Sequence, residues 1–366
     1  MHRGRPIERI IFGKNGHPYQ RFLSLPLHVI SSAYGLGVRA RLFLYGTGIL
    51  EGSRLPCKVI SVGNIILGGT GKTPTVEYIA RLLKDEGKGV VILSRGYGGE
   101  MERKLGLVSD GNRLLLSPAQ AGDEPYMLAQ RLKGIPIVVG RRRDLTGQYA
   151  IEHFHPDVII LDDGFQHLGV RRDVDILLVD SQIGFGNGSL FPRGPLREPL
   201  HQLDRADLFL MTKVEDLDTC RELEEMIKFH KKDPIIFHSN YRPDYLTTLD
   251  RDERLPVEYI KGRRIVALSA IVNPGYFRHL LELVGAKIDE EITFPDHHVY
   301  SEKDIPPLQD AMRRAECIVT TEKDAAKLMA VIKEDLPIMS LGISVNIMEG
   351  DQFKRTLLDM QGEPSK

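Results

Sequence analysis

The hydrophobic residues after Pro56 fall into short runs that alternate with longer stretches of helical spacing. Runs rich in Val, Ile and Leu on successive positions are typical of strands covered on both faces. Stretches such as Thr75–Lys84 and Glu124–Arg131 are predicted helices. The alternation predicts right-handed βαβ units and a mainly parallel sheet. The predicted strands are Lys58–Val62, Val90–Leu93, Ile137–Val139, Val158–Leu161, Ile176–Val179 and Leu208–Met211.

A second alternation follows the charged stretch Val214–Lys232, which we predict to be a helix that ends the first set. We therefore expect an N-terminal segment over residues 1–50, a core domain over 51–230 and a second α/β domain over 231–366. The second set consists of a strand at Ile265–Leu268, a helix after Pro274, a strand at Cys317–Thr320, a helix through Ala325–Met329 and a strand at Ile338–Leu341.

Composition places the chain among ordinary globular proteins. It has 366 residues, 42% hydrophobic and 27% charged, with a formal net charge of −1. That balance gives no reason to expect a nucleic-acid partner. The cysteines Cys57, Cys220 and Cys317 are isolated from one another. Their spacing argues against a disulfide framework and a zinc site, and fits a reducing compartment.

The first 50 residues contain seven basic residues and one acid, Glu8. The stretch Phe22–Val38 has no fixed charge and is flanked by Arg21, Arg39 and Arg41. It is too short and too dilute in apolar residues for a spanning helix. We reject a secretory signal because the nucleotide motif that follows requires cytoplasmic ATP. A helix in the interface of an anionic leaflet and a buried core helix with solvated arginines both remain open.

The sharpest motif is a glycine-rich loop that ends in Lys72-Thr73 and lies directly between a predicted strand and a predicted helix. Such a glycine loop directs backbone N–H groups at a phosphate, Lys72 reaches the terminal phosphates and the Thr73 hydroxyl binds Mg²⁺. The motif departs from the full P-loop pattern, because Ile66 replaces its first glycine, and Leu67 replaces the lysine of partition-type ATPases. The predicted nucleotide-binding residues are Gly68, Gly69, Thr70, Gly71, Lys72 and Thr73.

Two carboxylates, Asp162 and Asp163, end the apolar run Val158–Leu161. P-loop enzymes hold Mg²⁺ at such a strand end, although a helix cap is an alternative and either carboxylate could touch the metal. These features predict a P-loop NTPase-like three-layer α/β/α domain with a second, smaller α/β domain. Thr212-Lys213-Val214-Glu215 is weakly similar to a guanine-reading loop, with Thr and Glu in place of Asn and Asp.

Phosphoryl transfer also needs a base and cationic groups. Asp123, after Gly122, and His297 belong to different predicted domains. If they meet, they would together act as the general base that deprotonates a hydroxyl. Either alone is typical of a cap or a surface residue. Arg197 lies in the Gly/Pro-rich stretch Gly184–Pro199, which suggests a functional lid. Arg143 is the other cationic candidate, in a run typical of a solvated surface.

Together these motifs resemble the tetraacyldisaccharide 4′-kinases. The resemblance implies transfer of the γ-phosphate of ATP, with Mg²⁺, to the 4′-hydroxyl of an acylated glucosamine disaccharide 1-phosphate, giving lipid IVA. The matching segments are VGNIILGGTGKTP (62–74), SRGYGG (94–99), GDEP (122–125), LDDGFQH (161–167), NGSLFPRGPLREP (187–199), TK (212–213), FPDHH (294–298) and TTEKDAAKL (320–328).

The resemblance also implies roles for individual residues and a location. Asp123 with His297 would be the base, and Tyr97 and Gln166 would contact substrate. The N-terminal helix would attach to the cytoplasmic face of the bacterial inner membrane, and we expect a monomer. By matching motif, Lys72 and Thr73 serve phosphate and metal, Asp162 (or Asp163) and Glu198 lie near Mg²⁺, and Arg143 and Arg197 contact phosphate.

Two other classes of protein use similar loops. A nucleotide switch of the partition or metal-chaperone type predicts slow hydrolysis with no phosphorylated small product. A soluble small-molecule kinase or synthetase predicts that deletion of residues 1–45 leaves activity intact.

Overall fold

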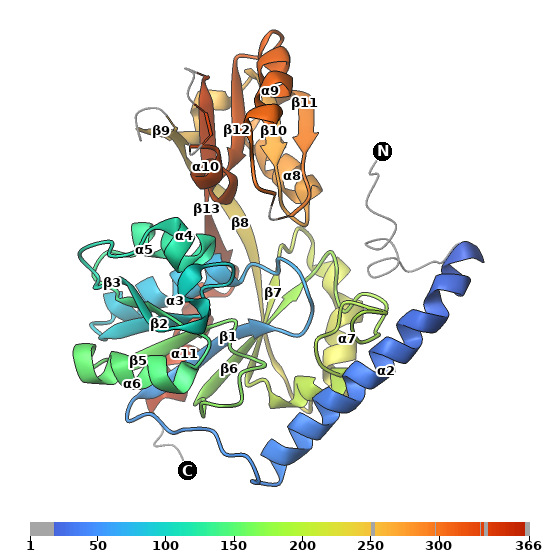
Figure 1. The fold of residues 1–366 in the computed structure, drawn as a ribbon, viewed down its shortest axis with the longest axis vertical. Coiled ribbons are helices and arrows are strands. Elements are labelled where there is room, and N and C mark those ends of the chain that lie inside the picture. The colour runs from blue at the N-terminus through green and yellow to red at the C-terminus, as the bar shows by residue number, and fades with distance from the viewer. Residues whose placement is uncertain (1–17, 250–252, 297, 330, 333–335, 363–366) are drawn as a thin grey trace. The chain divides into compact units, whose positions relative to one another are not determined.

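The computed structural model describes residues 18–249, 253–296, 298–329, 331–332 and 336–362. The chain divides into two compact units (Figure 1). Unit 1 comprises Met1–Asn240 and Ile347–Lys366, and unit 2 comprises Tyr241–Asn346. Strands β8 (Ile235–Thr248) and β13 (Ile338–Ile347) run through both units, so the chain passes from one unit to the other twice.

Unit 1 is built on a sheet with the strand order β8-β7-β6-β1-β5-β2-β4-β3. All neighbouring pairs are parallel except β3 with β4. The central strand β1 pairs with β5 on one side and with β6 on the other. The strands are β1 (Lys58–Asn64), β2 (Val90–Ser94), β3 (Gly106–Ser109), β4 (Ile137–Val139), β5 (Val158–Asp162), β6 (Val174–Asp180) and β7 (Leu208–Thr212).

Helices cover both faces of this sheet, as the predicted three-layer arrangement requires. Helix α3 (Lys72–Asp85) buries Val76, Ile79, Ala80 and Leu83, the spacing of an amphipathic helix. It contacts α5 (Asp123–Arg131), and both lie against the same face. Side chains on the opposite face of β1, β2, β4 and β5 pack against α6 (Arg143–Phe154), and those of β6 and β7 pack against α7 (Arg221–His230).

Helix α7 is shorter than the predicted helix Val214–Lys232. The Asp216 side chain accepts a hydrogen bond from the Asp218 N–H at 3.0 Å and caps a 3-10 turn at Leu217–Cys220. Aspartate at this position stabilises a separate turn, so the α-helix begins only at Arg221.

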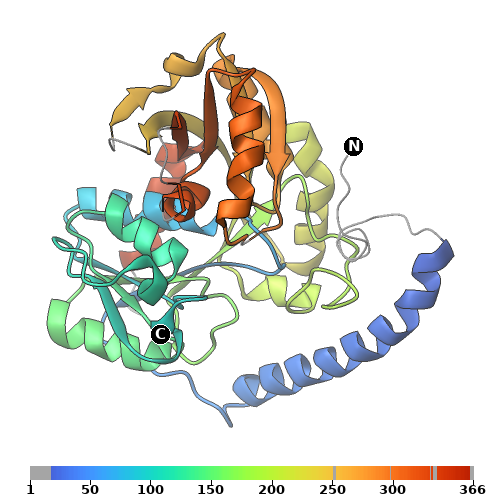
Figure 2. The same cartoon turned by 45° about the horizontal axis from the view of Figure 1, so that its top comes forward.

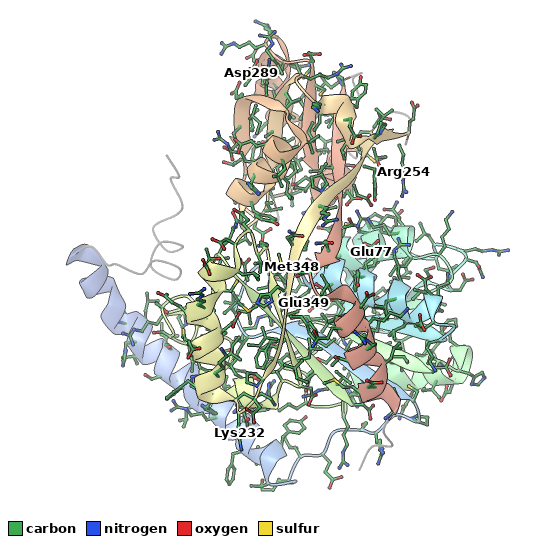
Figure 3. The ribbon with its side chains drawn as sticks, turned by 180° about the vertical axis from the view of Figure 1, so that it is seen from behind. Glu77, Lys232, Arg254, Asp289, Met348 and Glu349 are labelled. Atoms are coloured by element: carbon green, nitrogen blue, oxygen red, sulfur yellow. The ribbon has the colours of Figure 1, made fainter. Side chains whose placement is uncertain are left out.

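The last helix, α11 (Gly350–Gly362), belongs to unit 1, whereas the sequence analysis assigned residues 231–366 to the second domain. Phe353 is fully buried, with edge-to-face contacts to Phe237 of β8 and Tyr78 of α3. Figure 3 labels Met348 and Glu349, where the chain leaves β13 and enters α11. These aromatic contacts therefore pack the C-terminal helix against the hydrophobic core of unit 1.

Unit 2 is a smaller α/β unit. Strands β10, β11, β12 and β13 are parallel, and the antiparallel β9 pairs with β8. Val266, Leu268 and Ile318 form its core with residues of α9 and α10. The remaining elements are β9 (Arg254–Pro256), β10 (Arg264–Ser269), α8 (Pro274–Val284), β11 (Lys287–Thr293), α9 (Ile305–Met312), β12 (Cys317–Thr321) and α10 (Glu322–Leu328).

The predicted N-terminal segment contains one long helix, α2 (Pro18–Gly46), which is continuous but curved in Figure 2. Ser31 and Gly35 are buried, whereas Leu36 and Phe43 are 70% and 65% exposed. One side of the helix thus contacts the rest of unit 1, and apolar side chains remain exposed on the helix. Among the helices that the structure describes, none combines the length and hydropathy that crossing a bilayer requires.

Replacing Phe353 with alanine tests the assignment of α11 to unit 1. Because the ring is fully buried, we expect Phe353→Ala to lower the free energy of unfolding by about 3–5 kcal/mol in urea denaturation followed by circular dichroism. Phe229→Ala is the matched control, since that ring is 84% exposed, and should change it by less than about 0.5 kcal/mol. Equal stabilities of the two variants would contradict the packing.

Candidate active site

The phosphate loop connects β1 to α3 at the carboxyl end of the sheet. Gly68 and Gly71 have φ values of 120° and 86°, which side chains with a Cβ rarely adopt. Gly71 is the N-cap of α3 and has no side chain to accept from the first amides of the helix. Those amides, with the positive end of the helix dipole, form a site for an anion.

Polar side chains from neighbouring strand ends hold this loop in place. Asn64 donates to the Thr70 hydroxyl at 2.8 Å. The Thr212 hydroxyl donates to the Thr70 carbonyl at 3.0 Å, and Lys213 Nζ donates to the Gly69 carbonyl at 2.9 Å. Lys213 also pairs with the fully buried Asp180 at the end of β6. The segment that weakly resembled a guanine-reading loop therefore binds the phosphate loop's backbone.

Asp162, the last residue of β5, has one satisfied and one unsatisfied carboxylate oxygen. Ser94 donates to Oδ2 at 2.8 Å, and Oδ1 is buried without a hydrogen-bond partner among the described residues. Burial and the nearby Glu124 carboxylate raise the pKa of Asp162 to about 6. A buried acceptor lacking a donor is unfavourable, and a cation would satisfy it.

Asp163 lies between two cations. It adopts a left-handed conformation, with φ of 54°, after the strand end. Its carboxylate is 3.5 Å from Lys72 Nζ and accepts from Arg197 at 2.8 and 2.9 Å. Burial alone would raise the pKa of Asp163, but Lys72 and Arg197 bring it down to about 2. The carboxylate is therefore ionised at neutral pH.

Arg143 is buried, 3% exposed, and the expected surface position is wrong. It is the first residue of α6 and donates to the Asp162 carbonyl at 3.2 Å and to the Gly140 carbonyl. Burial lowers its pKa to about 10, so the guanidinium stays charged at neutral pH. Because α6 begins close to the end of β5, the Arg143 guanidinium places a positive charge beside Asp162 and Asp163.

Glu198 is 1% exposed and contacts two arginines. Arg41 of α2 lies 3.2 Å from Oε1, and Arg205 lies 2.5 Å from Oε2. Arg205 also stacks on the Phe165 ring, 4.4 Å from its centroid. The predicted metal-binding carboxylate is thus held by two guanidinium groups in this structure.

The glycine-rich segment 94–99 packs closely against the turn that precedes Asp123. A Cβ on Gly99 would lie 2.6 Å from the Gln120 carbonyl, and a Cβ on Gly122 would lie 2.8 Å from the Tyr97 carbonyl. The two backbones can approach this closely only because both positions are glycine. This turn places Asp123 in the first turn of α5, and leaves Tyr97 66% exposed.

Comparison with known proteins bears on this arrangement. Residues 23–361 match the family model described as Tetraacyldisaccharide-1-P 4′-kinase. The chain belongs to this family. A tetraacyldisaccharide 4′-kinase of Syntrophus aciditrophicus is 42% identical over 347 residues, 92% of this chain and 93% of that protein. One from Geobacter metallireducens is 41% identical over 325 residues, 88% of this chain and 94% of that protein.

A crystal structure from the family also matches. The LpxK of Aquifex aeolicus, described as an "apo" form in complex with ATP, has a TM-score of 0.73 and 34% identity, covering 92% of this chain and 99% of that one. The P-loop α/β fold and the kinase class are therefore confirmed, and the nucleotide-switch alternative is not favoured.

In this member of the kinase family, unit 1 brings most of the predicted site residues together. Gln166 accepts from Arg197 at 3.2 Å and donates to the Asn64 carbonyl at 2.8 Å, so its amide contacts protein groups at both ends. His297 lies outside the described residues, and its pairing with Asp123 remains a prediction. The predicted residues gathered in unit 1 are Gly68–Thr73, Arg143, Asp162, Asp163, Gln166, Arg197 and Glu198.

The polar residues that support the kinase site were not predicted from the sequence. Asn64, Ser94 and Asp180 end β1, β2 and β6, and Arg205 ends the 3-10 turn Leu200–Arg205. A signal was available, because a polar residue that ends an apolar strand lies at the ligand-binding edge of a parallel sheet. The Arg205 contact has no comparable signal.

Replacing Lys213 tests its support of the phosphate loop. Lys213→Met leaves the buried Asp180 without its cation, and we expect a loss of about 3–5 kcal/mol in the free energy of unfolding, measured by chemical denaturation. Adding Asp180→Asn should recover part of that loss, because the charge no longer needs a partner. A single variant as stable as the parent would show that the pair is unimportant.

Proposed function

We propose that this chain transfers the γ-phosphate of ATP to the 4′-hydroxyl of a tetraacylated glucosamine disaccharide 1-phosphate, the lipid A precursor, giving lipid IVA. Membership of the kinase family supports the reaction, and the Aquifex aeolicus relative was crystallised with ATP. The observation that best supports the proposal is that Lys72 of the phosphate loop and Arg197 both pair with the Asp163 carboxylate.

The loop amides and Lys72 would bind the nucleotide's β- and γ-phosphates, with Thr73 at the start of α3. The unsatisfied oxygen of Asp162 fits a cation at this edge. Bound Mg²⁺ would neutralise charge on the phosphates. Among the described residues no group of three or more His, Cys, Asp or Glu side chains is arranged to hold a metal ion by itself. Enzymes of this class bind Mg²⁺ through one or two carboxylates together with phosphate oxygens. Asp163 and Glu198 are the other candidate ligands.

Lys72 and Arg197 would stabilise the transferred phosphoryl group. Both contact the Asp163 carboxylate here, and phosphate oxygens offer the same kind of partner. Arg143, which donates to the carbonyl of Asp162, would add positive charge at the same strand end. Exchange of a carboxylate partner for a phosphate partner needs no new cation in the site.

Asp123 would accept the proton of the attacking sugar hydroxyl, assisted by His297. The support is the position of Asp123 in the first turn of α5, whose start packs against the glycine turn that carries Tyr97. Tyr97 is exposed and would contact the acceptor. Gln166, bound to Arg197, would contact the acceptor beside the phosphate.

Helix α2 would rest on the cytoplasmic surface of the inner membrane, where the acylated acceptor lies. The exposed Val29, Ile30, Leu36 and Phe43, with Arg39 and Arg41 between the last two, suit an interfacial helix. We propose that the protein is a monomer that binds this surface peripherally.

The reaction is tested by incubating the protein with γ-labelled ATP, Mg²⁺ and the acylated disaccharide 1-phosphate in nonionic detergent. Label should enter the lipid, and Lys72→Ala should abolish transfer. Label appearing only as free phosphate would refute the proposed acceptor and support a nucleotide hydrolase.

The role of Asp123 has its own test. We expect Asp123→Ala to lower kcat about 10²–10⁴-fold, the usual contribution of a positioned base, measured by the same lipid-labelling assay. Asp85→Ala on α3, an exposed carboxylate, is the control and should retain the parent's rate. If Asp123→Ala turned over like the parent, another group would be the base.

The pKa of Asp162 predicts a pH dependence of Mg²⁺ binding. In the folded protein the pKa of Asp162 is about 6, above its ordinary value of 3.8, so the folded state binds the proton more tightly than the unfolded state. The contribution of this proton to the free energy of unfolding therefore declines as pH rises through 6. A protonated carboxylate does not ligate Mg²⁺. The apparent Mg²⁺ affinity in the presence of ATP should therefore fall as pH is lowered from about 7.5 to about 5.5. Asp162→Asn should remove most of that dependence, and an unchanged slope would exclude Asp162 as a ligand.

A further inference from the structure

Helix α2 contacts the loop that carries two of the proposed site residues. Ser31 donates to the Leu190 carbonyl at 2.8 Å, and Tyr34 donates to the Arg197 carbonyl at 2.9 Å. A Cβ on Gly35 would lie 2.8 Å from the Leu190 side chain, so glycine permits the close approach. These contacts join the helix to both ends of the segment between residues 190 and 197.

Arg41 extends this attachment to the site itself. One guanidinium nitrogen donates to the Gln166 carbonyl at 2.8 Å and to Glu198 Oε1 at 3.2 Å. Glu198 is 1% exposed, and a buried carboxylate needs charged or hydrogen-bonding partners for both oxygens. Arg205 serves the other oxygen. Without Arg41, the carboxylate would lose the partner that fixes its orientation on the α2 side.

The same loop lies along the segment that leads into the phosphate loop. Leu67 N–H donates to the Pro195 carbonyl at 2.7 Å, and Arg197 N–H donates to the Ile65 carbonyl at 2.8 Å. Arg197 is therefore fixed by its backbone to residues just before Gly68 and by its carbonyl to Tyr34. A shift of Glu198 would be transmitted directly to Arg197, because the two residues are adjacent in the chain.

From these contacts we infer that Arg41 is a positioning residue for phosphate transfer: it fixes Glu198 and, through the adjoining backbone, Arg197. The inference rests on the proposed function for its kinetic consequence only. Helix α2 is on this account part of the scaffold of the active site, and its role does not reduce to contact with a lipid surface.

Hydrogen exchange of the full-length protein, without lipid, nucleotide or metal, tests the structural part. In Arg41→Gln, peptides containing the Leu67 and Arg197 amides should exchange about tenfold faster than in the parent, because the segment opens locally more often. Arg39→Gln is the matched control: Arg39 is exposed on the same helix, two residues away and so on another face. It should exchange like the parent, and Arg41→Lys should restore part of the protection.

The kinetic part uses the lipid-labelling assay in nonionic detergent. Arg41→Gln should lower kcat about tenfold to a hundredfold, the usual effect of losing a side chain that orients a site carboxylate, and leave the KM for the lipid unchanged. A changed lipid KM with unchanged kcat would show a surface-binding role and overturn the inference. So would unchanged exchange at Leu67 and Arg197. A parent without transfer would refute the proposed function, while the exchange experiment still tests the contact.

Tyr34→Phe provides a second variant if Arg41→Gln does not fold. It removes only the hydroxyl that donates to the Arg197 carbonyl. The Arg197 peptide should again exchange faster, by a smaller factor than in Arg41→Gln, with the helix content of the parent. Exchange equal to the parent's would contradict the proposal.

Discussion

The ion pairing of Asp163 with Lys72 and Arg197 is the interaction on which the site depends. The two cations would repel each other in a partly buried site if no anion lay between them. Asp163 offsets that repulsion, and the two cations in turn lower the pKa of its carboxylate. Its left-handed backbone turns the chain at the end of β5 so that the side chain faces the phosphate loop.

The remaining support is organised by the same edge of the sheet. Buried polar residues at the ends of β1 and β2 and directly after β7 each bond a neighbour: Asn64 to Thr70, Ser94 to Asp162 and Lys213 to Asp180. Each buried polar group left unpaired would cost free energy, so these pairs stabilise the strand ends and the phosphate loop beside them. Among the described residues, one carboxylate oxygen of Asp162 lacks such a partner, as does the amide oxygen of Asn64, and the Asp162 oxygen lies at the strand end where P-loop enzymes hold Mg²⁺.

Sequence reasoning predicted the parts of the fold that depend on local pattern. The apolar runs became strands β1, β2, β4, β5, β6 and β7, and the glycine loop precedes a helix, because strands covered on both faces and phosphate loops leave local signatures. It missed the burial of Arg143, since a run of arginines is normally solvated, and its partner is a carbonyl 19 residues further along the chain. The Arg41–Glu198 contact joins residues 157 apart, a separation for which one sequence has no signal.

The place of α11 illustrates a different limit. Its amphipathic pattern shows that one face is buried, but not against which core, and Phe353 packs against Phe237 and Tyr78. Unit 2 is consequently an insertion within unit 1. During synthesis the contacts of α11 with unit 1 cannot form until α11 leaves the ribosome, after unit 2 has been made. The apolar surface around Phe237 therefore stays uncovered while unit 2 is made, and exposed apolar surface of this kind favours aggregation.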